Sequence, residues 1–146
     1  MTDCAYCNDT TEKVIWNDGT TRVMYIHDSP FVGWCRVIWH AHELELTDLS
    51  EPDRARLMKT VFAVESGLRK LLAPAKINMA SMGTAMPHVH WHIVPRFPDD
   101  THFPEPVWST ARRERSDRAV PPDFVPEMQV HLGSVLGSNQ AFRSAR

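Results

Sequence analysis

Three histidines alternate with apolar residues in the segment PHVHWHIVPR, residues 87–96. If this segment is a β-strand, residues two apart project from one face at a spacing of about 7 Å, so His88, His90 and His92 share a face. The apolar residues between them would take the opposite face and enter the core. A buried imidazole needs a hydrogen-bond partner, so packing alone gives no reason for such a ladder, and the pattern indicates a functional site.

Two kinds of chemistry suit this ladder. Neutral imidazoles are common zinc ligands, so the three histidines could hold a catalytic metal. Alternatively, one neutral imidazole attacks an electrophile, while its neighbours bind the substrate's charge and protonate the leaving group. The absence of a His-Asp pair or Glu-x-x-His motif next to the ladder favours the nucleophile over the catalytic metal, although both alternatives stay open.

The segment HVHWHIV resembles the signature of the histidine triad (HIT) family, in which three histidines alternate with apolar residues. The segments MYIHDSPFVGWCRVIWHAH and INMASMG also resemble the family and occur in its order, so the resemblance spans residues 4 to about 108. The family consists of nucleotide hydrolases and transferases, usually homodimers, that cleave nucleoside phosphoramidates, dinucleoside polyphosphates or sugar nucleotides at the α-phosphorus. The resemblance implies a purine nucleotide substrate and a nucleotidyl-histidine intermediate.

The resemblance also implies roles for individual residues. His90 would be the nucleophile, His92 would contact the phosphate and the leaving group, and His88 would support the site. Asp28 falls where such proteins often bind the ribose hydroxyls, and a carboxylate can accept two hydroxyl hydrogen bonds at once; equally, it could be a turn residue. Candidate walls of the base pocket, or else ordinary core residues, are Val14, Ile15 and Ile26.

A second set of candidate ligands begins with the segment CAYC, in which Cys4 and Cys7 have the C-x-x-C spacing of half a zinc site. Some HIT proteins complete such a site with a histidine after the early strand and with the first triad histidine. By that resemblance, His42 and His88 would complete a closed, structural zinc site, with His40 as a rival for His42. The alternative is two free thiols.

The sequence departs from the family pattern at two positions. Trp34 stands where many members carry a histidine behind the nucleophile, and Ala85 stands where many carry a phosphate-binding Ser or Thr. Other candidate donors to the substrate are Thr84, Ser81 and Asn78. Trp108 lies where some relatives extend an aromatic residue across the dimer, although it could pack within its own subunit. With Phe97 and Phe103, it would form an exposed aromatic tail suited to an interface.

The remaining pattern predicts the elements that position these residues. Ser50 and Asp53 form a helix-capping pair, a stripe of apolar residues at steps of three and four follows, and Pro74 ends the helix. A shorter helix is expected near residues 127–136. Strands are predicted at residues 14–16, 22–26, 34–39, 76–83 and 87–96.

This order predicts an α+β fold: a HIT-like antiparallel sheet of about five strands, with one long helix packed on it and a short C-terminal helix. Residues 1–110 would form the HIT-like domain. Residues 111–146, which are rich in proline and charge, would form a partly irregular C-terminal extension.

Composition limits the partners. The 146-residue chain is 42% hydrophobic and 23% charged, with a net charge of −2, which gives no reason to expect binding to a membrane or a nucleic-acid polymer. Three cysteines, without a signal-peptide pattern at the N-terminus, suggest a reducing, cytoplasmic location. Together with what the resemblance implies, we expect a cytoplasmic homodimeric enzyme that has one structural zinc and needs no organic cofactor. The alternatives are a nucleotide-binding or scaffolding protein with little activity and a metal-dependent enzyme that uses the triad as ligands.

Overall fold

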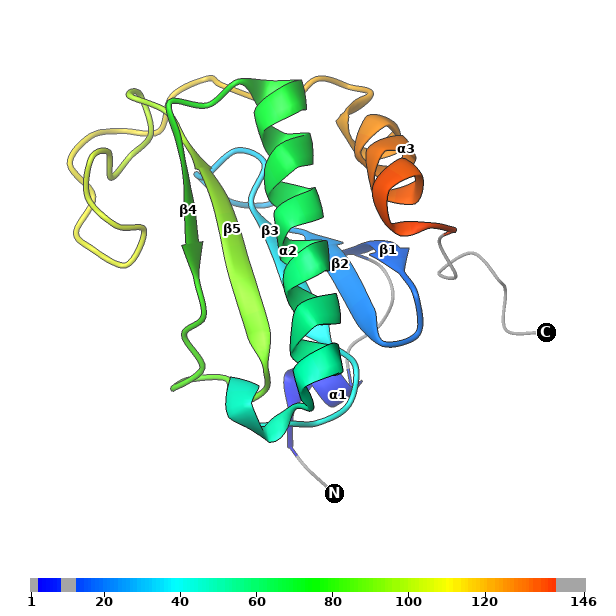
Figure 1. Cartoon of the computed structure of the whole chain (residues 1–146). Helices are drawn as coiled ribbons and strands as arrows, with labels where there is room; N and C mark the ends of the chain where they lie inside the picture. The colour runs from blue at the N-terminus through cyan, green and yellow to red at the C-terminus, as the bar shows by residue number, and fades with distance from the viewer. Residues whose placement is uncertain (1–2, 9–12, 139–146) are drawn as a thin grey trace.

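A five-stranded antiparallel sheet forms the centre of the protein in the computed structural model, which describes residues 3–8 and 13–138 (Figure 1). The strands lie in the order β1-β2-β3-β5-β4. Their bounds are β1 Val14–Asn17, β2 Thr21–Tyr25, β3 Cys35–Trp39, β4 Lys76–Ala80 and β5 His90–Arg96. The predicted α+β class and the antiparallel sheet are confirmed.

The hairpin of β1 and β2 is closed by side chains of its own turn. The Asp18 carboxylate accepts hydrogen bonds from the backbone N–H groups of Thr20 and Thr21, each at 2.8 Å. Gly19 takes φ +91°, a conformation that glycine adopts without the steric cost of a Cβ. The second strand ends at Tyr25, one residue earlier than predicted.

The helix α2, Glu51–Leu72, covers one face of the sheet (Figure 1). The Ser50 hydroxyl accepts a hydrogen bond from the Asp53 backbone N–H at 3.3 Å, as the capping pair predicts. Ala73 ends the helix in the left-handed conformation, directly before Pro74. The predicted apolar stripe is buried against the sheet and includes Leu57, Val61, Val64 and Leu68.

The C-terminal helix α3, Phe124–Leu136, begins three residues before its predicted start. The earlier start is explained by Phe124, which is buried with its ring 5.1 Å from that of Tyr25. Phe124, Met128 and Leu132 belong to the same hydrophobic core as α2 and the sheet. A domain boundary near residue 110 stays a prediction, but the buried face of α3 lies in the core shared with the sheet.

The last two strands, one of which carries the histidine ladder, are shorter than predicted. β4 ends at Ala80 rather than at Gly83, and β5 begins at His90 rather than at residue 87. A tight turn accounts for the late start, because the His88 N–H donates to the Met86 carbonyl at 2.8 Å. His88 therefore precedes the strand, while His90 and His92 lie within it.

The structure also has two further short helices, which are α1, Ala5–Asn8, and the 3-10 helix η2, Leu46–Asp48. The α1 segment packs on the sheet face opposite α2, where Cys4 and Tyr6 cluster with Met24 and Ile38. Within residues 3–8 and 13–138, none of the helices has the length and apolar character needed to cross a membrane.

Candidate active site and metal cluster

All three triad histidines are buried, with exposed fractions of 1% for His88, 2% for His90 and 6% for His92. The intervening Val89, Trp91 and Ile93 belong to or pack against the main core under α2. The alternation therefore separates core from site, as the sequence predicts, although only the last two histidines lie in the strand itself.

The hydrogen bonding of His90 determines which of its nitrogens is available. Its Nδ1 lies 2.6 Å from the His88 backbone oxygen, and a carbonyl oxygen can only accept, so Nδ1 carries the proton. In the neutral ring, Nε2 is then left with its lone pair. Burial lowers the pKa of His90 below its usual value despite the opposing effect of this hydrogen bond, so the neutral form prevails near pH 7.

His92 lies beside this lone pair. The two Nε2 atoms of His90 and His92 are 3.1 Å apart, whereas the buried His92 Nδ1 has no partner among the described residues. Burial, and then the nearby His90 and Arg36, lower the His92 pKa to about 4. The imidazole is in contact with two indoles, with centroid distances of 5.6 Å to Trp34 and 5.3 Å to Trp108.

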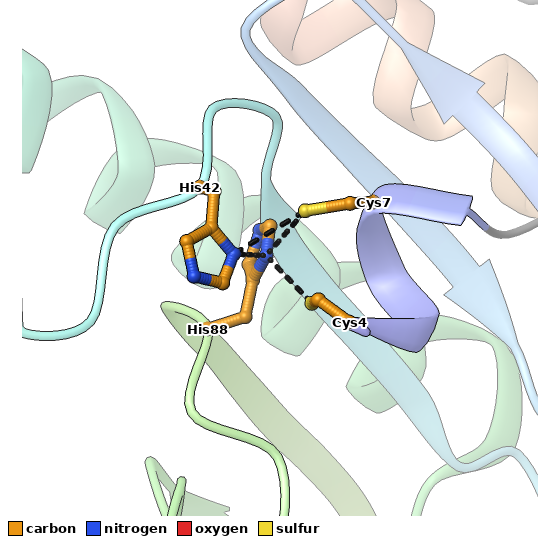
Figure 2. Close-up of side chains that lie close together, drawn as sticks. All are labelled: Cys4, Cys7, His42 and His88. Carbon is orange, nitrogen blue, oxygen red and sulfur yellow. Dashed lines mark hydrogen bonds between the residues drawn. The ribbon is translucent and has the colours of Figure 1, made fainter. Parts of the chain in front are cut away.

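His88 turns Nδ1, rather than Nε2, towards two cysteines and a further histidine. Its Nε2 lies 2.6 Å from the Trp39 backbone oxygen, so Nε2 carries the proton and Nδ1 is free to act as a ligand. This Nδ1 lies 3.4 Å from Cys4 Sγ, 3.6 Å from Cys7 Sγ and 3.3 Å from His42 Nδ1. Figure 2 shows the four side chains converging from α1 and the residue before it, the loop after β3 and the turn before β5.

The spacing of these four side chains fits a tetrahedral metal site. Zinc–sulfur bonds of about 2.3 Å and zinc–nitrogen bonds of about 2.0–2.1 Å imply separations of about 3.3–3.8 Å between ligand atoms. The separations between the ligand atoms include 3.3 Å from Cys7 to His42, and all four lie within 4.8 Å of one another. The cluster of Cys4, Cys7, His42 and His88 could therefore hold a metal ion. His40 is exposed and lies outside it.

The cysteine segment also covers His90, a contact that the sequence patterns did not predict. The Tyr6 ring lies edge-on to the rings of His88 and His90, at centroid distances of 5.7 Å and 5.0 Å. The Tyr6 backbone oxygen accepts a hydrogen bond from Arg22, and its hydroxyl accepts one from Arg36 at 3.2 Å. The alternation of side chains along the predicted strands could have indicated this contact. Each arginine alternates with residues that face α2, so it projects from the opposite face of the sheet.

The residues expected to contact the substrate divide between two cavities. One, of about 460 Å³, is lined in part by Asn78, His92 and Trp108. The other, of about 570 Å³, is lined in part by Ser81, Thr84 and His88. Asp28 is exposed and lines neither of these two cavities.

Two of the candidate substrate contacts already form hydrogen bonds within the protein. The Ser81 hydroxyl donates to the His90 backbone oxygen at 2.8 Å, and the Asn78 side-chain oxygen accepts from Arg96 at 2.7 Å. Among the suggested base-pocket residues, Ile15 lies in the main core, whereas Val14 packs with Tyr6 on the site face. In the aromatic tail, Phe97 is buried, so the prediction of an exposed Phe97 was wrong.

Comparison with known proteins agrees with this arrangement. The model of the HIT domain matches residues 8–99. A histidine triad protein from Bradyrhizobium japonicum is 25% identical, with a TM-score of 0.66 over 86% of this chain and 92% of that chain. No curated protein gives a significant match.

Two more distant structures share the fold. A Zn-bound histidine triad family protein from Mycobacterium smegmatis is 21% identical, with a TM-score of 0.62 over 90% of this chain and 94% of that chain. A histidine triad nucleotide-binding protein, described as hypothetical, from Sulfolobus tokodaii is 17% identical, with a TM-score of 0.61 over 92% and 97% of the respective chains. The family model, which covers more than half of the chain, together with the shared fold and the buried triad, establishes that this chain belongs to the HIT family.

Proposed function

We propose that the protein is a nucleotide hydrolase or nucleotidyl transferase that cleaves its substrate at the α-phosphorus through a covalent intermediate on His90. One observation carries the proposal: the hydrogen bond from His90 Nδ1 to the His88 carbonyl, at 2.6 Å, leaves a neutral Nε2 lone pair on the site face. A nucleophile needs that lone pair before the substrate arrives, and burial keeps the ring unprotonated near pH 7.

The first half-reaction requires no proton to leave His90. The Nε2 lone pair forms a nitrogen–phosphorus bond while the bond from phosphorus to the leaving group breaks, and the leaving group takes the electron pair. The phosphorylated ring becomes an imidazolium, whose Nδ1–H still donates to the His88 carbonyl. This charge-assisted hydrogen bond stabilises the intermediate.

The proton for the leaving group is assigned to His92, whose Nε2 lies 3.1 Å from the attacking nitrogen. Its pKa of about 4 in the ligand-free protein makes it neutral, but an anionic phosphoryl group beside the ring favours the protonated form. After the first product leaves, water forms an oxygen–phosphorus bond as the nitrogen–phosphorus bond breaks. The proton of that water returns to His92, and His90 regains its lone pair.

We also propose that the ion held by Cys4, Cys7, His42 and His88 is a structural zinc. Two cysteine sulfurs and two imidazole nitrogens are the donor set that zinc prefers, and the Zn-bound relative from M. smegmatis supports the choice. The hydrogen bond from His88 Nε2 to the Trp39 carbonyl provides the outer partner typical of ligand histidines. All four positions are protein ligands, so the proposed ion stabilises the site and takes no part in the reaction.

A purine nucleotide substrate, a homodimeric assembly and a cytoplasmic location belong to the same proposal. Trp108, half exposed beside His92, is the aromatic residue that supports an interface near the site. Neither Cys4 nor Cys35 forms a disulfide bond within the described residues, which suits a reducing compartment. Sedimentation at micromolar concentration would test the dimer, and a monomer throughout that range would contradict it.

The test of the activity is a substrate screen with purified, zinc-replete protein. Adenosine and guanosine phosphoramidates and dinucleoside polyphosphates are offered, and release of the nucleoside monophosphate is followed. We expect turnover that persists when exchangeable divalent metal is removed from solution. If nucleotides raise the Tm and none is cleaved, the protein is a binding or scaffolding member of the family. Activity that depends on added metal would indicate the triad as a metal site.

A further inference from the structure

The site face of the sheet carries an arginine whose charge is not neutralised. Ion pairs within residues 3–8 and 13–138 join Arg96 to Asp100, Arg112 to Glu105 and Arg118 to Asp99. No described carboxylate pairs with Arg36. A guanidinium is a cation, so the site contains a positive charge without a paired carboxylate.

Arg36 lies next to the reactive imidazoles. It is the register partner of His92 across the β3–β5 ladder, and directly paired residues project from the same face with Cβ atoms about 4.5–5.5 Å apart. Its guanidinium carbon is 5.4 Å from the centroid of the Trp34 ring, which in turn is in contact with His92. Its Nη1 donates to the Tyr6 hydroxyl, and the Tyr6 ring lies against His90.

Most of the hydrogen-bonding capacity of Arg36 is unused. A guanidinium has five N–H donors, and the one hydrogen bond from this side chain to a described residue is the bond to Tyr6. The Nε atom is buried and has no partner in the described chain. A partly buried cation with unpaired donors loses hydration without compensation. An anion bound at this position would restore both the charge balance and the hydrogen bonds.

The segment between β4 and the triad offers few side-chain hydroxyl donors for a phosphate. Ala85 has no side-chain donor where many family members carry Ser or Thr. Thr84 is exposed, and the Ser81 hydroxyl proton is directed to the His90 carbonyl. The attack by His90 increases negative charge on the phosphoryl oxygens, which requires a cation or oriented donors nearby.

We infer that Arg36 binds the non-bridging oxygens of the substrate's α-phosphoryl group, and so replaces the missing hydroxyl donor with a full positive charge. The inference rests on the proposed function for the identity of the substrate. It predicts that affinity depends on the phosphoryl charge of the ligand more than on its nucleoside.

The experiment compares the binding of AMP and adenosine, which differ only in the phosphate, by calorimetry. Wild type, Arg36→Met and Arg36→Lys are tested, together with Arg69→Met, which removes the same charge from an exposed position on α2. We expect wild type and Arg69→Met to bind AMP more tightly than adenosine. Arg36→Met should lose about 10- to 100-fold in AMP affinity with adenosine affinity unchanged, and Arg36→Lys should be intermediate.

A second measurement uses the unmutated protein and so does not depend on the folding of a variant. The NMR signal of the Arg36 Nε–H group should shift on addition of AMP or inorganic phosphate and stay in place with adenosine. The inference would be overturned if the Arg36 Nε–H signal does not shift with AMP or with inorganic phosphate. It would also be overturned if the Arg36→Met protein keeps the full preference for AMP. Neither result requires turnover. If Arg36→Met loses the preference for AMP and no nucleotide is cleaved, the inference about Arg36 is supported and the proposed catalysis is contradicted.

Discussion

His88 and His90 are two residues apart and equally buried, yet they offer opposite ring nitrogens to their surroundings. His88 donates from Nε2 to the Trp39 carbonyl and turns Nδ1 towards two thiols and His42. His90 donates from Nδ1 to the His88 carbonyl and turns Nε2 towards His92. One arrangement suits a closed metal site, and the other suits an open nucleophile.

The difference shows that backbone carbonyl groups, rather than residue type, assign the chemistry of each histidine. An imidazole has two similar nitrogens, and the acceptor that holds the proton of one decides which lone pair is free. The two sites are also connected, because the His88 residue that would bind the metal provides the carbonyl that orients His90. The comparison predicts that the two functions can be separated by mutation.

The largest effect is expected from His90→Ala. Removing the nucleophile should lower turnover by about 10³-fold or more, while zinc content and nucleotide affinity stay close to wild type because the cluster does not include His90. Steady-state kinetics and metal analysis measure both quantities. His40→Ala is the matched control, since His40 is exposed and lies outside the cluster. Retained turnover in His90→Ala would contradict the assignment of the nucleophile.

Substitution of a residue in the metal cluster should change stability and also zinc content, which His90→Ala leaves close to wild type. Wild type is expected to contain about one zinc per chain, and Cys4→Ser should lower both zinc content and the free energy of unfolding, by about 3 kcal/mol or more. Cys35→Ala serves as control, because Cys35 is buried in the core and is not a member of the cluster. It should destabilise the protein without loss of zinc. A metal-free wild type with the same free energy of unfolding as the zinc-containing protein would contradict the proposed zinc site.

His92→Ala sharpens the comparison within the open site. We expect turnover to fall by about 10²-fold, less than for His90→Ala, because a proton donor accelerates a step that can proceed slowly without it. The loss should be greatest for substrates with poor leaving groups, which need the proton most. Rates measured across a series of leaving groups test this, and an equal loss for every member would argue against proton donation by His92.

The smallest effect concerns pH and stability. The His92 pKa is about 4 in the folded protein, against an ordinary value of 6.5. As pH falls from about 6.5 to about 4, the unfolded chain therefore binds a proton that the folded chain does not, and stability decreases. At pH 5 this should amount to about 2 kcal/mol.

Urea unfolding at pH 7.5 and pH 5 measures this difference. Wild type should lose more stability between the two pH values than His92→Gln, in which the titrating ring is absent. Acid loss of the metal ligands affects both proteins and cancels in the comparison. Equal pH dependence in the two proteins would show that His92 is not held neutral by the fold.

Local patterns in the sequence predicted much of the fold. The Ser50 cap, the apolar stripe of α2 and the strict alternation around His90 each depend on neighbours in the chain. The errors fall where distant contacts decide. α3 begins early because Phe124 packs on Tyr25, and β5 begins late because His88 is held in a turn.

The site was predicted less completely for the same reason. Spacing identified the two cysteines and the triad, and the family resemblance added His42. No local pattern shows that the Trp39 carbonyl selects the ligand nitrogen of His88, or that Tyr6 covers His90. Arg36 was visible as the single charge in an apolar strand. Its lack of a carboxylate partner becomes evident only when β3, β5 and α1 are placed together.

The central claim is that His90 forms a covalent bond to the α-phosphorus, and the most direct test is to isolate that bond. Wild type is quenched during turnover of a substrate labelled at the α-phosphate, and the digested protein is analysed by mass spectrometry. The account predicts an acid-labile, base-stable nucleotidyl group on His90, absent from His90→Ala. Turnover without any labelled protein, or a label on His92 instead, would contradict it.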